Sequence, residues 1–74
     1  MPDIDVDAVI ARLLPQVLAD RALGDGGSFT PLHLRHLWAL TCLHAGQYCE
    51  EADVEHRTRR LLPPNVLLAG EVSA

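Results

Sequence analysis

The sequence contains no lysine, and six arginines carry all of its fixed positive side-chain charge. Acidic residues outnumber them, so the net charge at pH 7 is −4. Such a chain presents no broad basic surface to phosphates, and nucleic acid is therefore disfavoured as a partner. The glycines of the segment GDGGS at 24–28 do not form a Walker-type phosphate loop, because that loop requires a lysine. Arginine without lysine also indicates a GC-rich, bacterial coding sequence.

Cysteines, aromatic residues and long apolar runs are also scarce. Two cysteines do not make a disulfide framework, and one Phe, one Trp and one Tyr leave a core of Leu, Val and Ala. No apolar run approaches the ~18 residues of a membrane span, and the acidic start MPDIDVDAV is no signal peptide. We therefore expect a soluble cytoplasmic protein that forms a single domain, with no membrane partner.

The segment Thr30–Gly46 has the strongest helix signals. Thr30 is a good N-cap residue, Pro31 occupies the first helical position, and Gly46 suits the left-handed residue that ends a helix. Most of this helix is apolar, and Arg35 is its one fixed charge. A helix that is apolar nearly all round is buried, so we predict a central helix over 30–46.

The N-terminal segment has apolar residues at helical spacing, and we predict a helix from about Asp5 to Leu23, with Asp5 or Asp7 as its cap. Pro15 lies inside it, and a mid-helix proline costs roughly 3 kcal/mol. Residues 1–23 are therefore predicted to form a kinked helix or two short ones. Residues 24–29 form a glycine-rich linker.

The C-terminal third combines a charged helix with an apolar tail. Residues 47–62 are predicted to form a polar helix, in which Asp53–Arg57 and Glu55–Arg59 have the favourable acid-before-base spacing. Pro63 and Pro64 end it, and the tail 63–74 either packs on the helices, pairs as a strand or docks on a partner. The predicted fold class is all-α, a small orthogonal or hairpin bundle of three helices, or four short ones.

The histidines and cysteines do not converge as a metal or catalytic site would require. His33 and His44 are separated by about 16 Å along a helix axis, so one zinc ion cannot bind both. Cys42 and His44 are too close in sequence to share a helix face. Cys42 and Cys49 flank the turn after the central helix and can approach each other. We therefore predict no catalytic residues, no metal and no cofactor.

The segment GQYCEEADVEHRTRRLLPPN resembles the second helix of a tetratricopeptide repeat. Gly46, Tyr48, Ala52 and Pro64 match the glycine, tyrosine, alanine and closing proline of that pattern, and Trp38 stands in the preceding helix. The match requires one inserted residue after Tyr48 and covers one repeat. The resemblance implies a helical hairpin and, in function, binding of a peptide or protein.

The central helix has more apolar surface than three short helices can cover. We therefore predict a non-catalytic protein–protein interaction module, a small accessory or adaptor subunit that forms a homodimer or docks on a larger protein partner. The alternative is a helix-turn-helix nucleic-acid-binding regulator, because Arg57, Arg59 and Arg60 follow a short turn. The predicted interaction residues are a helical stripe and the apolar tail: His33, Leu37, Leu40, His44, Val66, Leu67 and Leu68.

Overall fold

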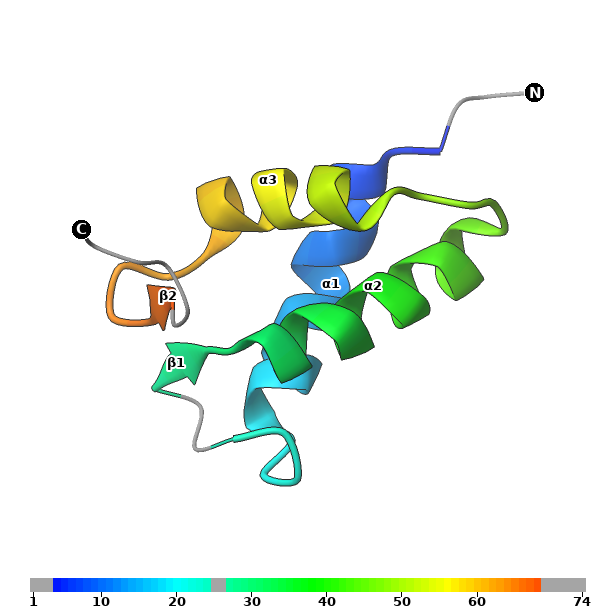
Figure 1. Cartoon of the computed structure of the whole chain (residues 1–74). Coiled ribbons are helices and arrows are strands. Elements are labelled where there is room, and N and C mark those ends of the chain that lie inside the picture. Colours follow the sequence, from blue (N-terminus) through cyan, green and yellow to red (C-terminus); the bar gives the residue numbers. More distant parts are fainter. Residues whose placement is uncertain (1–3, 25–26, 69–74) are drawn as a thin grey trace.

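The part of the chain that the structure describes forms three helices and two very short strands (Figure 1). The structure is a computed structural model that describes residues 4–24 and 27–68. The helices are α1 (Val6–Ala19), α2 (Pro31–Ala45) and α3 (Glu51–Leu61), and each contacts the other two. The strands are β1 (Ser28–Phe29) and β2 (Leu67–Leu68). The predicted all-α bundle is confirmed, with three helices.

Helix α1 begins at the expected cap and continues through Pro15. The side chain of Asp5 accepts a hydrogen bond from the backbone N–H of Ala8 at 3.2 Å. The helix is not split, and it ends at Ala19, four residues before the predicted end. Ala11 and Pro15 both lie on its exposed side, so water can hydrate the Ala11 carbonyl that the proline leaves without its helical N–H.

Helix α2 has the predicted boundaries because both of its ends are capped. The Thr30 side chain accepts a hydrogen bond from the backbone N–H of His33. In return, the His33 side chain accepts a hydrogen bond from the backbone N–H of Thr30. This arrangement is a capping box in which histidine takes the place of the usual acidic residue. Gly46 has φ 69°, and its N–H bonds to the carbonyls of Cys42 and Leu43. Glycine adopts this conformation without a steric penalty.

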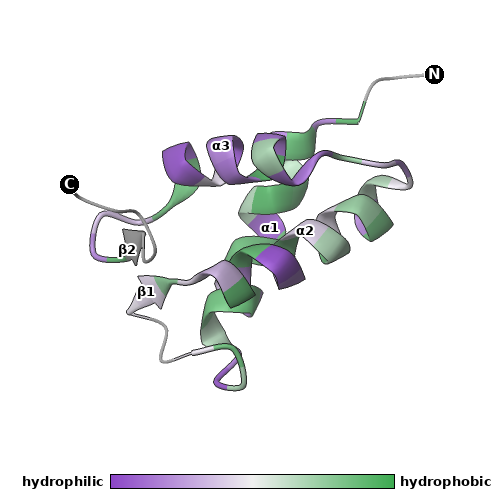
Figure 2. Ribbon diagram, in the orientation of Figure 1, coloured by the Kyte–Doolittle hydropathy of each residue, from purple (hydrophilic) through white to green (hydrophobic). Residues whose placement is uncertain are grey.

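Helix α3 begins later than predicted, at Glu51, and residues Tyr48 to Glu50 before it are not helical. The predicted ion pairs form: Arg57 Nε lies 2.9 Å from Asp53, and Arg59 lies 3.7 Å from Glu55. Most of α3 is hydrophilic (Figure 2). Its buried residues are Val54 and Thr58.

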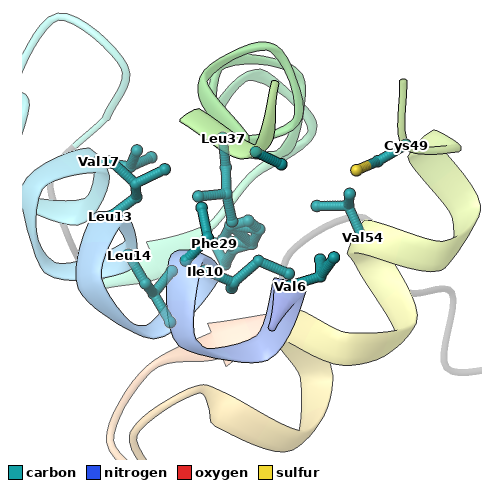
Figure 3. Packing of buried hydrophobic residues seen from close by; sticks show 11 residues of the cluster. Val6, Ile10, Leu13, Leu14, Val17, Phe29, Leu37, Cys49 and Val54 are labelled. Carbon is teal, nitrogen blue, oxygen red and sulfur yellow. The ribbon is translucent and has the colours of Figure 1, made fainter. Parts of the chain in front are cut away.

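The core lies where one side of α1 meets α2 and α3 (Figure 3). Ile10, Leu37 and Val54 contribute one fully buried side chain from each helix. The buried apolar cluster comprises Val6, Val9, Ile10, Leu13, Leu14, Val17, Phe29, Leu37, Ala45, Cys49 and Val54. None of the described helices is long and apolar enough to cross a membrane.

Strands β1 and β2 pair in parallel, with Ser28 opposite Leu67 and Phe29 opposite Leu68. This pairing changes the prediction for the linker and selects among the alternatives for the tail. The end of the glycine-rich linker is a strand, and the start of the apolar tail adopts the strand alternative by pairing with it. The pairing joins the segment before α2 to the segment after α3.

Candidate functional site

The outer face of α2 carries an exposed stripe that no other described element covers. We define the outer stripe as Leu32, His36, Ala39 and Leu43, which follow one another at helical spacings of four, three and four. All four are exposed, with Leu32 at 51% and Leu43 at 74%. Two largely exposed leucines therefore mark the two ends of this face, with His36 and Ala39 between them. This stripe is the candidate functional site.

The predicted interaction stripe lies mostly in the protein's own core. His33 and Leu37 are 0% exposed, Leu40 is half-buried, and His44 is exposed. Leu37 lies in the core cluster with Ile10 of α1 (Figure 3), and the His33 ring stacks on Phe29. His33 and Leu37 are therefore not an open surface, which corrects the expectation that this face needs a cover. Leu40 borders the outer stripe, and its contact with a partner stays a prediction.

The burial of His33 has a structural explanation. Its Nδ1 accepts a hydrogen bond from the Thr30 backbone N–H at 2.9 Å and lies 2.8 Å from the Thr30 hydroxyl. The ring stacks on Phe29 with centroids 5.8 Å apart. A Cβ on Gly24 would lie 2.7 Å from His33 Cε1, so glycine is required there. His33 thus secures the start of α2 and the segment leading to it.

The tail residues of the predicted site also lie against their own chain. Val66 is half-buried and packs on the core cluster. The backbones of Leu67 and Leu68 pair with β1. Val66 thus follows the first alternative, packing on the helices, and Leu67 and Leu68 follow the second, pairing as a strand. A role for Val66, Leu67 and Leu68 in binding a partner stays a prediction.

The histidines of α2 point in different directions. His33 is buried in the core, whereas His36 lies on the exposed outer stripe, so these two do not form half of a metal site. No group of three His, Cys, Asp or Glu residues within 4–24 and 27–68 is arranged to hold a metal ion.

The turn between α2 and α3 brings the two cysteines together. Cys42 Sγ accepts a hydrogen bond from the Cys49 N–H at 3.3 Å and lies 3.5 Å from the Cys49 carbonyl oxygen. Trp38 Nε1 donates to that same carbonyl at 2.6 Å. Burial raises the pKa of the Cys49 thiol, and the neighbouring Cys42 raises it further. These contacts hold residue 49 outside the helix, which explains the late start of α3.

The raised pKa of Cys49 predicts a loss of stability in alkaline solution. The pKa of the Cys49 thiol is higher in the folded protein than in the unfolded chain. The contribution of the protonated thiol to the free energy of unfolding is therefore complete below about pH 8.5 and is lost as pH rises through the folded-state pKa. We expect the urea midpoint to fall above pH 9, and to fall less for Cys49→Ala. Equal pH dependence of the two proteins would contradict this linkage.

Thr41 of α2 is fully buried, and no described residue is a hydrogen-bond partner of its hydroxyl. A buried polar group without a partner costs about 1–3 kcal/mol. We expect Thr41→Val to stabilise the fold by about 1 kcal/mol in urea unfolding. Thr58→Val is the matched control, because the buried Thr58 hydroxyl donates to the Val54 carbonyl at 2.7 Å. Thr58→Val should leave the free energy of unfolding unchanged or lower it. A Thr58→Val variant more stable than Thr41→Val would contradict the argument.

The arginines of α3 form ion pairs with carboxylates. Arg57 also donates to Asp7 of α1 at 2.9 Å, and Arg60 lies 3.7 Å from the same carboxylate. The hydrogen bonds to Asp7 and Asp53 raise the pKa of Arg57. These pairs connect α3 to the start of α1.

Tyr48 and Ile4 are the other large apolar residues among those exposed. Tyr48 is 74% exposed, and its ring meets Trp38 edge-to-face at a centroid distance of 6.5 Å. Trp38 precedes Ala39 by one position, so it lies around the helix from the outer stripe. Tyr48 is thus a single exposed side chain, of the kind common on protein surfaces.

The stripe predicted from the sequence contains His33, Leu37, Leu40 and His44, and not the exposed face that contains Leu32, Ala39 and Leu43. Arg35 was the available signal, because the fixed charge of α2 marks the side toward solvent. Comparisons with known proteins add no family: no protein-family model, no curated protein and no solved structure matches this chain. The likeness to a tetratricopeptide repeat thus stays an interpretation of the sequence.

Proposed function

We propose that this protein is a non-catalytic protein–protein interaction module that binds through the outer stripe of α2. The observation that carries the proposal is the exposure of Leu43 and Leu32 on one face of a well-capped helix. Burying exposed apolar area contributes about 25 cal/mol per Å². In this chain of 74 residues, the other described helices are already engaged with one another through the core.

The partner that the outer stripe fits is a second copy of the chain. Its spacings of four, three and four residues are the same in both directions along the helix. Two antiparallel copies of α2 related by a twofold axis would pair Leu32 with Leu43 of the second copy. His36 would then meet the small Ala39, which leaves room for the imidazole ring. An isologous contact of this kind closes after two subunits.

The charges of α2 predict how the dimer responds to salt. The helix contains no Asp or Glu, and its one arginine, Arg35, lies beside the outer stripe. Two copies therefore bring no opposite charges together, and apolar burial supplies the attraction. Salt should leave the dimer intact, whereas binding to nucleic acid weakens steeply with salt. Four residues per copy form a small contact, so we expect Kd in the range of about 10 µM to 1 mM.

Sedimentation equilibrium of the whole chain tests the proposal. The mass should rise from 8.1 kDa toward twice that value with concentration, equally at low and high salt. A mass of 8.1 kDa at millimolar concentration would contradict it. Salt-sensitive binding to duplex DNA would favour the helix-turn-helix alternative, which the paired arginines of α3 do not support.

A further inference from the structure

The pair Cys42 and Cys49 has a geometry that the interaction module does not require. Cys42 lies in the last turn of α2 and is half-buried, and Cys49 lies just before α3 and is 7% exposed. The Cys42 sulfur already contacts the backbone N–H of Cys49 at 3.3 Å. The two cysteines are thus neighbours at the turn that joins the two helices, and both are free thiols.

We propose that Cys42 and Cys49 form a reversible intramolecular disulfide, which makes the turn between α2 and α3 a redox-responsive site. The Cys42 sulfur lies 3.3 Å from the backbone nitrogen of residue 49, so the two cysteines are close neighbours across the turn, and a disulfide joins only cysteines whose backbones lie close together. The loop that the bond closes runs from residue 42 to residue 49 and contains the left-handed Gly46. The outer stripe lies on a different face of α2, so this inference is independent of the proposed dimer.

The oxidant is a low-molecular-weight disulfide, and the exchange has two steps. The thiolate of Cys42, the more exposed thiol, attacks one sulfur of the small disulfide, forming a mixed disulfide and releasing one small thiol. The Cys49 thiolate then attacks the Cys42 sulfur, breaks the mixed disulfide and releases the second small thiol. Two electrons pass from the cysteines to the small disulfide, and the two cysteine protons end on the released thiols.

Oxidation changes the contacts that hold the turn. Reduced Cys42 donates toward the Cys49 carbonyl at 3.5 Å, whereas a disulfide sulfur has no proton to donate. Trp38, the single tryptophan, donates to the same carbonyl at 2.6 Å, so its fluorescence reports on the turn. Closing this short loop constrains the unfolded chain. We therefore expect the melting temperature of the oxidised protein to rise by about 10 °C.

Glutathione redox buffers test the proposal on the full chain, with alkylation and mass spectrometry as the readout. We expect one intramolecular disulfide, a mass loss of two hydrogens and a change in Trp38 fluorescence. The equilibrium constant for forming the Cys42–Cys49 disulfide in the glutathione buffer should be at least about tenfold larger in the folded chain than in urea. This ratio corresponds to the expected stabilisation of the folded protein by the disulfide.

Two variants control for the chemistry. Cys42→Ser and Cys49→Ser should each retain the fold in circular dichroism, form only a mixed disulfide with glutathione, and show no rise in melting temperature. If the wild-type protein instead carries two glutathione groups, forms only intermolecular disulfides or oxidises more readily in urea, the proposal is overturned. If either variant unfolds, the comparison of folded and urea-treated wild-type protein still decides the question.

Discussion

Leu37→Ala should lower the free energy of unfolding by about 2–5 kcal/mol. Leu37 is 0% exposed and lies among apolar side chains of α1, so its truncation leaves a cavity at the centre of the core (Figure 3). A domain of 74 residues has a total stability of about 4–11 kcal/mol. The loss is thus a large fraction of the whole, and we expect the urea midpoint to fall by about half.

Leu43→Ala is the matched control, because it makes the same substitution on the same helix at a side chain that is 74% exposed. In monomeric protein it should change the free energy of unfolding by less than about 0.5 kcal/mol. Urea unfolding of both variants, measured at a concentration where the wild type is monomeric, checks the pair. Equal losses in the two variants would show that α2 does not bury the face that contains Leu37.

Leu43→Glu should abolish self-association while leaving the monomer folded. In the proposed dimer, Leu43 packs against Leu32 of the second copy, so a glutamate there would bury a charge with no partner. We expect an affinity loss of at least about 100-fold, which corresponds to about 2.7 kcal/mol. Sedimentation should then give 8.1 kDa at every concentration, with an unchanged circular dichroism spectrum.

Tyr48→Glu provides the comparison for this substitution. Tyr48 is as exposed as Leu43, at 74%, but it lies beside Trp38 and away from the outer stripe. The variant should dimerise as the wild type does. If Tyr48→Glu dissociates the dimer and Leu43→Glu does not, the interface lies at the turn between α2 and α3 instead.

The sequence predicted the features that depend on local chemistry. Thr30 and Gly46 define the ends of α2 because capping and left-handed conformations are set by residues within one turn. Asp53 and Arg57 pair as expected, because four residues separate neighbours along one face of a helix. The all-α fold class follows from signals of this kind, repeated along the chain.

Features that depend on contacts between distant segments were not predicted. Every face of α2 is partly apolar, so its pattern did not reveal that α1 covers the side of Leu37. The late start of α3 results from the hydrogen bonds of Trp38 and Cys42 to residue 49, which helix propensity does not include. Strand pairing of the tail was one alternative, but its partner β1 was not predicted, because the two strands lie about 40 positions apart, as Phe29 opposite Leu68 shows.

Concentration-dependent NMR of the whole chain tests the central claim, that the outer stripe of α2 is a surface for self-association. Amide shifts should change between dilute and concentrated samples at Leu32, His36, Ala39 and Leu43, while Ile10 and Val54 in the core and Tyr48 at the turn stay constant. Shifts that are independent of concentration, or that change only around Tyr48, would contradict the claim.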